Sequence, residues 1–421
     1  HPRRACRGRH RAGGLAHRDA LAPQVMMLGI IGAGIGGLTA ALACRRAGID
    51  VRLFDQAPAL EEVGAGLQLG PNAVRVLRAL GLSEALARFA SRPEAIHFRD
   101  AHSGRLLAHL TLGLRAEQRY GAPYYHVHRA DLQAALLEAA ADVGIEPVLD
   151  ARCVRIAEGD GNVTAGFQDG RLVQCDVLIG ADGIRSFVRQ HLFGSDPARF
   201  TGKVAFRGTV RTSALGGEPV NPVVTAWLGP HRHFVSYFVR GGELVNYVAV
   251  IEDESWRDEA WDIPAQRAEL TRHFGSWHAE VRRVIEATES CHKWALHDRD
   301  PLNEWSRGRV ALLGDACHPM LPFLAQGAAM AIEDGYTLAA MLAVHSEDPA
   351  AGIEGYVTRR RARATRVQRE SRRQGELYHL ERPLQVATRN AVLGIGSRLL
   401  PGIAMRRYDW LFGFDAVTGL G

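Results

Sequence analysis

The chain is poor in lysine and in paired cysteines. Its only lysines are Lys203 and Lys293, so nearly all of its basic charge is arginine. Its six cysteines are scattered and form no C-x-x-C pair. This pattern excludes a redox-active disulfide motif and a zinc ribbon, and it predicts free thiols in a reducing, cytoplasmic compartment.

Long hydrophobic runs are also missing. The longest uncharged run, Met26 to Cys44, contains five glycines between Gly29 and Gly37 and is too short and too interrupted to span a membrane. With 421 residues, 47% apolar and 23% charged, the chain can bury two substantial cores, and disordered and fibrous classes are excluded. We expect a globular protein without a membrane partner.

Positive charge is concentrated at the N-terminus. The formal net charge is +5, but residues 1–20 contain six arginines and one aspartate, so the remainder is nearly neutral. We therefore expect no nucleic-acid partner. Residues 1–26 lack the apolar core of a secretory signal, and we interpret them as a flexible, dispensable leader, with a transit-like peptide as the alternative. The arginine-rich run 359–373 is interpreted as a solvated helix face packed against a neighbouring domain.

A glycine-rich turn near the start predicts a dinucleotide site. Residues 27–31 are continuously apolar like a buried strand, residues 38–47 fit a helix, and residues 51–54 fit a second strand that ends at Asp55. In such a unit Gly32 permits the tight turn, Gly34 admits a pyrophosphate, and Gly37 allows close packing. Asp55 is placed to bind a ribose diol, and the motif alone fits NAD and FAD equally.

The rest of the chain predicts a mixed α/β protein. An amphipathic helix is expected over 129–143, a three-stranded meander over 151–180 and a buried strand over 309–313. Residues 326–342 and most of the last seventy residues fit helices. The segment 200–300 contains strand-like runs and no second glycine fingerprint, which predicts an inserted, mostly antiparallel domain.

Two further motifs carry a family resemblance. The segments Asp176 to Arg189, with Asp182-Gly183, and Arg309 to Pro319, with Gly314-Asp315, follow the glycine turn in order. All three motifs resemble those of the aromatic-hydroxylase class of flavoprotein monooxygenases, the group of p-hydroxybenzoate, salicylate, 3-hydroxybenzoate and 6-hydroxynicotinate hydroxylases. The resemblance extends from residue 27 to about residue 380.

The resemblance implies an α/β fold in which a Rossmann-like, glutathione-reductase-like FAD domain is discontinuous and receives a β-rich substrate domain. We expect C-terminal helices after these two domains. The predicted boundaries are a leader over 1–26, an FAD-binding domain over 27–100, 126–199 and 301–375, a substrate-binding domain over 101–125 and 200–300, and a C-terminal helical segment over 376–421.

By the same resemblance, FAD binds non-covalently and Asp315 contacts its ribityl chain. The segment Pro322 to Ala329 would lie beside the flavin ring, where amides at the start of a helix stabilise negative charge on reduced flavin. Asp182 is either a cofactor contact or a helix-capping residue in a turn. The predicted cofactor-binding residues are Gly32, Gly34, Gly37, Asp55, Arg129, Asp182, Gly314, Asp315, Gly327 and Ala328.

Substrate residues are predicted on strands of the inserted domain. Alternation places His233, Val235 and Tyr237 on one face, so an imidazole and a phenol can both meet one substrate and move its phenolic proton. The alternative is that both groups are merely satisfied within a half-buried sheet. No carboxylate accompanies these histidines at metal-ligand spacing, so no metal is expected. The predicted catalytic residues are His233, Tyr237 and Pro322, and the predicted substrate-binding residues are Gln68, Arg207, His233, Tyr237 and Phe323.

The resemblance implies a monooxygenase that uses NADH or NADPH and O2 to hydroxylate a small aromatic hydroxy acid through a flavin C4a-hydroperoxide. The reduced nicotinamide would visit transiently, because no second dinucleotide motif exists. Relatives that act on hydroxynicotinate have histidines where this chain has Gln68 and Phe323, which favours a carbocyclic, salicylate- or 3-hydroxybenzoate-like acid. A flavin dehydrogenase or reductase of the same fold and a catalytically silent FAD-binding protein remain alternatives. A monomer or homodimer is expected.

Overall fold

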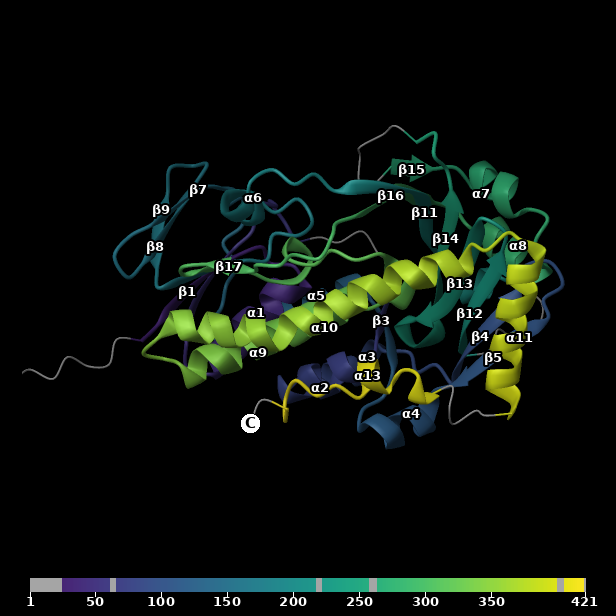
Figure 1. Ribbon diagram of the computed structural model, residues 1–421, viewed down its shortest axis with the longest axis horizontal. Coiled ribbons are helices and arrows are strands. Elements are labelled where there is room, and N and C mark those ends of the chain that lie inside the picture. The colour runs from purple at the N-terminus through teal and green to yellow at the C-terminus, as the bar shows by residue number, and fades with distance from the viewer. Residues whose placement is uncertain (1–24, 61–65, 217–221, 257–262, 400–404, 420–421) are drawn as a thin grey trace, which may run out of the picture.

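The computed structural model describes residues 25–60, 66–216, 222–256, 263–399 and 405–419. Two sheets lie at opposite ends of the molecule, and the long helix α10 (Pro349–Tyr378) runs along both (Figure 1). The predicted leader, residues 1–26, lies almost wholly outside the described residues, which begin at Val25. Among the helices that the structure describes, none has both the length and the apolarity needed to cross a bilayer.

The first sheet is built on the predicted glycine turn. Because residues 27–31 are apolar without alternation, β1 is buried on both faces, and it pairs in parallel with β2 and β10. The predicted β1–α1–β2 unit is present, with α1 spanning Ile35–Arg46. In spatial order the five strands are β17 (Ser306–Arg307), β18 (Val310–Leu312), β10 (Val177–Gly180), β1 (Met27–Ile31) and β2 (Asp50–Phe54).

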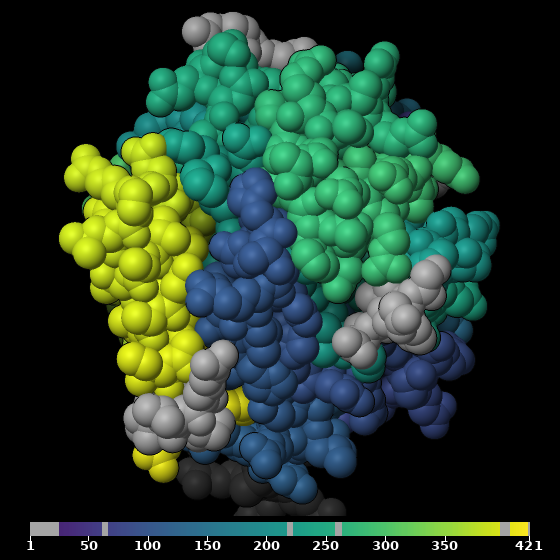
Figure 2. Space-filling model, turned by 90° about the vertical axis from the view of Figure 1, so that its right-hand side faces the viewer, coloured from purple at the N-terminus to yellow at the C-terminus, as the bar shows by residue number. Residues whose placement is uncertain are grey.

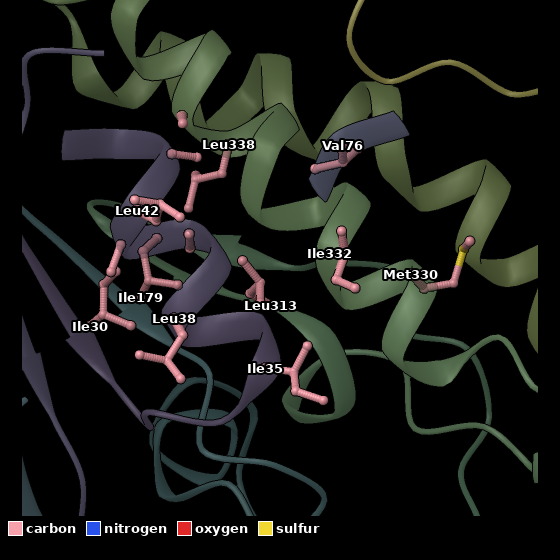
Figure 3. Close-up of a cluster of buried hydrophobic side chains, with 14 of the residues drawn as sticks. Ile30, Ile35, Leu38, Leu42, Val76, Ile179, Leu313, Met330, Ile332 and Leu338 are labelled. Carbon is pink, nitrogen blue, oxygen red and sulfur yellow. The ribbon is translucent and has the colours of Figure 1, made fainter. Parts of the chain in front are cut away.

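Helix α9 (Gly327–Val344) packs directly on α1. At Gly335 a Cβ atom would stand 2.7 Å from the Ala40 nitrogen, so only glycine permits this approach. Figure 3 shows Leu38 of α1 and Leu338 of α9 in one cluster with Ile30 of β1. This packing fixes the N-terminal end of α9 relative to the glycine turn.

The middle of the FAD-binding part agrees with the predicted pattern. Helix α5 spans Arg129–Ala141, and the predicted meander consists of β7 (Cys153–Glu158), β8 (Val163–Phe167) and β9 (Leu172–Cys175). The short antiparallel pair β3 (Gly66–Leu69) and β6 (Tyr125–His128) was not predicted. The remaining helices of this part are α2 (Pro71–Ala79), α3 (Ser83–Phe89), α4 (Gly113–Tyr120) and α6 (Phe187–Phe193). Helix α4 lies within residues 101–125, which were predicted to belong to the substrate-binding domain, but it packs on α2 and shares the first core cluster.

The second sheet has eight strands and contains the predicted strand-like runs. Helices α7 (Arg267–Phe274) and α8 (Ala279–Glu286) pack on it through the cluster that contains Phe234 and Phe274. Its strands, in spatial order, are β15 (Ile263–Ala265), β16 (Cys291–Asp298), β11 (Arg199–Arg211), β14 (Leu244–Glu252), β13 (Arg232–Val239), β12 (Val223–Gly229), β4 (Ala95–Asp100) and β5 (Leu106–Thr111).

Strand β4 corrects one predicted boundary. The FAD-binding segment was predicted to run to residue 100, but β4 pairs in parallel with β12 and antiparallel with β5. Residues 95–100 therefore belong structurally to the eight-stranded sheet. This pairing joins residues more than one hundred positions apart, which no local pattern reveals.

The C-terminal part is helical, as predicted. Helix α11 (Pro383–Leu399) lies against β5 at the edge of the eight-stranded sheet, where Figure 2 shows it in yellow beside the blue strands. The short helix α13 (Asp409–Phe412) returns to the FAD-binding part and contacts α2.

The arginine-rich run on α10 is not simply a solvated face, so that prediction is wrong in part. Arg360 is 0% exposed, because it shares the buried side of the helix with Tyr356, Ala364 and Val367. Arg359 and Arg361 are exposed, as predicted.

Candidate active site

A cavity of about 410 Å³ lies between the two sheets. Its wall combines the glycine turn after β1, the strand β3, the inner faces of β12, β13 and β14, and the start of α9. One continuous space thus touches both the predicted cofactor residues and the predicted substrate residues.

The three fingerprint glycines have different surroundings. Gly32 has φ +107, and a Cβ there would stand 2.3 Å from the Ala181 carbonyl oxygen. A Cβ on Gly37 would stand 1.9 Å from the Gly32 oxygen, so close packing requires glycine. At Gly34 a Cβ would meet nothing within 4 Å, although the residue lines the cavity. The open backbone at Gly34 therefore suits the approach of a phosphate at a helix N-terminus.

Asp55 lies at the end of β2, where it organises the glycine turn. Its carboxylate accepts hydrogen bonds from the Ala33 nitrogen (2.7 Å) and the Ala57 nitrogen (2.8 Å). A carboxylate has lone pairs for further donors, so these bonds leave room for ribose hydroxyls. The residue is not part of the cavity wall described above, and its ribose contact stays a prediction.

Asp182 has the contacts of a helix cap. Its carboxylate accepts hydrogen bonds from the Ser186 hydroxyl and from the Val188 nitrogen, and Ser186 in turn caps α6 by accepting from the Arg189 nitrogen. The geometry favours the capping alternative. Its neighbour Gly183 lines the cavity with φ +74, and a cofactor contact by Asp182 itself stays a prediction.

Asp315 follows Gly314, whose φ of +61 turns the chain after β18. Its side chain is open to the cavity but lies deep within the protein. This burial away from bulk water raises the pKa of the carboxyl group. Arg129, at the start of α5, also lines the cavity, and its positive charge partly offsets that rise. No hydrogen bond to Asp315 is found among the described residues. A ligand with several hydroxyl groups would satisfy this carboxylate.

The start of α9 presents small residues to the cavity. Gly327 and Ala328 line it, and a Cβ on Gly327 would approach nothing closer than 3.9 Å. Pro322 begins a short 3-10 helix, Pro322–Leu324, that also lines the cavity, and Ala325 follows it with a left-handed φ of +51. The helix amides, the open glycine backbone and Asp315 together fit FAD.

A buried ionic network, which was not predicted, lies behind Asp315 and the start of α9. Arg360 donates from Nε to Asp334 Oδ1 (2.7 Å) and pairs with Glu333, and all three side chains are 0% exposed. His318 Nε2 lies 2.5 Å from Asp334 Oδ2, and Arg363 pairs with Glu333 at 2.7 Å. Asp334 Oδ2 also accepts from the Gly314 nitrogen (3.2 Å). The network therefore ties α9 and α10 to the turn that carries Asp315.

The charges in the network control its protonation. Burial alone raises the pKa of Asp334, but the charges of His318 and Arg360 outweigh it and hold the pKa at about 2. Burial likewise opposes ionisation of Glu333, and Arg360 and Arg363 lower its pKa overall. Both carboxylates are thus ionised in the folded protein.

Strand β13 places the predicted substrate residues on the cavity wall. His233, Val235 and Tyr237 all line it, as the alternation predicted. The phenol of Tyr237 lies near Gln68, which accepts from the Tyr124 hydroxyl (2.9 Å). His233 and Tyr237 lie four positions apart on this strand, roughly 13 Å. The imidazole and the phenol therefore stand at different parts of one cavity.

His233 is nearly fully buried, with 3% exposure. Its ring packs edge-on against Phe323 (centroids 5.5 Å apart), which also lines the cavity. Burial lowers the pKa of His233 well below the usual value, and His379 and Lys203 lower it further. The imidazole is therefore neutral at neutral pH, so one of its ring nitrogens has a lone pair that can accept a hydrogen bond.

Arg207 is not brought to the cavity with these residues. On β11 it pairs with Val248, a cavity residue of β14, but its guanidinium lies over the Trp294 ring, 4.9 Å from the centroid. One strand thus separates Arg207 from the wall that His233 and Tyr237 form. A substrate contact by Arg207 has no support in this position.

Several cavity residues from the C-terminal part were missed. Tyr378 closes α10 beside His233, and Tyr408, Leu411 and Phe412 reach the cavity from the segment around α13. No short motif marks these residues, because they meet the cavity only after the chain has returned across the FAD-binding part.

A family model described as an FAD binding domain matches residues 24–371. The chain belongs to this family. It is 40% identical to a 3-amino-4-hydroxybenzoate 2-monooxygenase of Streptomyces platensis, over 92% of the chain and 96% of the relative. It is 39% identical to a 6-hydroxynicotinate 3-monooxygenase of Bordetella bronchiseptica, over 92% and 95%. A salicylate hydroxylase solved with its substrate superposes with a TM-score of 0.79 at 31% identity, covering 95% of this chain and 98% of that one.

These likenesses confirm the predicted fold class, the FAD cofactor and the enzyme class, an FAD-dependent aromatic monooxygenase. The roles of individual residues rest on the geometry alone.

Proposed function

We propose that this protein hydroxylates a small carbocyclic aromatic acid that carries a ring hydroxyl group, using NAD(P)H and O2. The observation that carries the proposal is the single cavity between Asp315 and the start of α9 on one side and His233 and Tyr237 on the other. An aromatic acid in this space would lie against the flavin, with its ring hydroxyl toward His233 and its other polar group toward Tyr237.

The FAD would be held without a covalent bond. Asp315 would accept from the ribityl hydroxyls, Gly34 and the start of α1 would receive the pyrophosphate, and the first amides of α9 would face the flavin ring. When bound, FAD would accept electrons from NAD(P)H and use them to activate O2. The small side chains of Gly327 and Ala328 leave space for the ring.

The chain keeps the reacting centre dry. Much of the wall near His233 is apolar, including Phe98, Val248 and Leu321. Excluding water limits the unproductive loss of activated oxygen as hydrogen peroxide and strengthens the electrostatic effect of the few polar groups present. We infer that a bound aromatic acid completes this apolar enclosure.

His233 would accept the proton of the ring hydroxyl. Its neutral imidazole is the form that a general base requires, and a phenolate directs more electron density into the ring than a phenol does. Tyr237 and Gln68 would orient the acid at the other part of the cavity, since both carry hydrogen-bonding groups on the wall.

Phe323 supports the carbocyclic choice. Its apolar ring packs edge-on against His233 and offers no partner to a ring nitrogen. The relatives act, by their names, on an aminohydroxybenzoate and on a hydroxynicotinate, and both substrates combine a ring with a carboxylate. We also propose a cytoplasmic location, which the free, buried thiols of the five described cysteines support.

The test is oxygen consumption with a panel of salicylate, 3-hydroxybenzoate, 3-amino-4-hydroxybenzoate and 6-hydroxynicotinate. We expect one benzoate to stimulate NAD(P)H oxidation and to gain one oxygen atom in its product. Stimulation by 6-hydroxynicotinate alone would contradict the carbocyclic assignment. Consumption of substrate without oxygen incorporation would contradict the oxygenase.

A further inference from the structure

A chain of hydrogen-bonded side chains runs from the cavity to the surface at the end of the eight-stranded sheet. His233 Nδ1 lies 2.7 Å from His379 Nε2, and His379 Nδ1 lies 3.0 Å from Glu252 Oε1. Glu252 Oε2 lies 2.7 Å from His231 Nδ1. His233 lines the cavity, whereas the side chain of His231 is 47% exposed. This hydrogen-bonded series of side chains thus faces the cavity at one end and the solvent at the other.

Four separate parts of the fold hold these four side chains in place. His233 lies on β13, Glu252 is the last residue of β14, His379 caps the C-terminal end of α10, and His231 forms the turn between β12 and β13. His231 has a left-handed φ of +58, and its carbonyl accepts from the Glu252 nitrogen (3.0 Å). A non-glycine residue in this conformation is held there by its surroundings.

The charged groups described around these side chains keep Glu252 ionised and favour a protonated His231. Burial opposes ionisation of Glu252, but bonds from His231 and His379 and the charge of Lys203, 3.5 Å away, lower its pKa overall. The pKa of His231 is raised, first by its bond to Glu252, and its Nε2 lies 2.6 Å from Glu381. Glu252 is therefore an anion, and its bond to His231 favours the protonated form of that surface imidazole.

The two buried imidazoles are neutral. Burial lowers the pKa of His379 to about 4 and that of His233 well below its usual value. An ionised Glu252 can only accept, so His379 donates from Nδ1 and must accept at Nε2. His233 then donates from Nδ1, which leaves its Nε2 without a proton. The Glu252 carboxylate thus sets the His233 tautomer through His379.

We propose that His379 and Glu252 are positioning residues that hold His233 as a proton acceptor and carry the proton of a phenolic substrate to the surface at His231. The proposal rests on the proposed function, since it assumes a phenol in the cavity.

Protons balance along this path. The substrate O–H bond breaks as an N–H bond forms at His233 Nε2, and the His233 Nδ1 proton passes to His379 Nε2. The His379 Nδ1 proton passes to Glu252, His231 releases one proton to water, and the Glu252 proton then passes to His231. Product release reverses the path, because the product phenolate takes one proton back. Neither buried imidazole carries a lasting charge.

Two variants of one residue separate the two roles of His379. In His379→Gln the amide can accept from His233 and donate to Glu252, so the His233 tautomer is kept while proton transfer stops. In His379→Phe both bonds are lost. The matched control is His109→Gln, which removes one imidazole from another histidine pair, His97 and His109 (3.0 Å), that lies outside the cavity wall.

The probe is 4-hydroxy-3-nitrobenzoate, whose phenolate absorbs visible light, bound to the FAD-loaded enzyme. We expect the acid dissociation constant of the probe's phenol to fall about tenfold in His379→Phe relative to the wild type, so its pKa rises by about one unit. His379→Gln should stay within about twofold of the wild-type constant but release the proton at least about tenfold more slowly to an indicator dye in stopped flow.

An ionisation constant and a release rate in His379→Phe equal to those of the wild type and of His109→Gln would overturn the proposal. Glu252→Gln provides a second check away from the cavity, and it should raise the probe's pKa in the same direction as His379→Phe. Failure of the proposed function would look different, because the probe would ionise as described while no aromatic acid gained oxygen.

Discussion

Replacing Arg360 with methionine tests the buried ionic network behind Asp315 and the start of α9. Methionine keeps the length of the side chain but removes the charge that faces Glu333 and Asp334, all of which are 0% exposed. Removing one partner of a buried ion pair costs about 3–5 kcal/mol, because the other charge stays buried. Arg363 still pairs with Glu333 at 2.7 Å, and His318 still lies 2.5 Å from Asp334. We therefore expect a loss at the lower end, about 3 kcal/mol.

The matched control is Arg359→Met, one residue earlier on α10 and exposed. A surface substitution of this kind changes stability by about 0.5 kcal/mol or less. Urea denaturation of the FAD-loaded enzyme, followed by tryptophan fluorescence and FAD release, compares the two variants. A loss in Arg360→Met within about 1 kcal/mol of that in Arg359→Met would refute the energetic role of the network.

The pH dependence of this loss follows from the depressed carboxyl pKa values. A depressed pKa stabilises the fold above the unfolded value, 4.5 for Glu333 and 3.8 for Asp334, and this stability is lost as pH falls toward the folded value of about 2 for Asp334. Without Arg360, burial favours protonation of both acids. The difference between Arg360→Met and the wild type should therefore be full at about pH 7 and shrink as the pH falls and the two acids of the variant, whose pKa values burial raises, become protonated. A constant difference over this range would contradict the argument.

Four further substitutions test the site itself. Asp315→Ala should abolish most FAD binding, measured by flavin absorbance after purification, because it removes the assigned partner of the ribityl hydroxyls; full yellow occupancy would refute that role. Asp55→Ala should weaken FAD binding less, by about 1–3 kcal/mol, since hydrogen bonds alone are lost; an unchanged FAD affinity would contradict the assignment of Asp55. His233→Ala and Tyr237→Phe should lower the product formed per NAD(P)H oxidised more than the rate of flavin reduction, and unchanged coupling in both would return them to a purely structural role.

Local signals predicted the elements that surround the proposed FAD site. The β1–α1–β2 unit and the Gly314-Asp315 turn each lie within about thirty residues, so glycine spacing and apolar runs suffice to place them. The shared face of His233 and Tyr237 followed from strand alternation alone. These features depend on neighbours along the chain.

Features that depend on distant pairing were missed. Nothing near Ala95 indicates its parallel pairing with Val223, and nothing near His379 indicates its bond to His233. The burial of Arg360 was detectable in principle, since Tyr356 and Val367 mark an apolar helix face that includes it. The adjacent acids of α9, Glu333 and Asp334, within an otherwise apolar helix were the complementary signal, because buried carboxylates require cationic partners.

We expect NAD(P)H oxidation by this protein to insert oxygen into an aromatic acid. The most direct measurement supplies the FAD-loaded enzyme with NAD(P)H, the benzoate that stimulates it most, and oxygen-18 gas, and then weighs the product. We expect a product with one added oxygen-18 atom, formed faster than in the absence of the enzyme and in lower yield per NAD(P)H in His233→Ala. Rapid NAD(P)H oxidation whose product carries no oxygen-18 would contradict it.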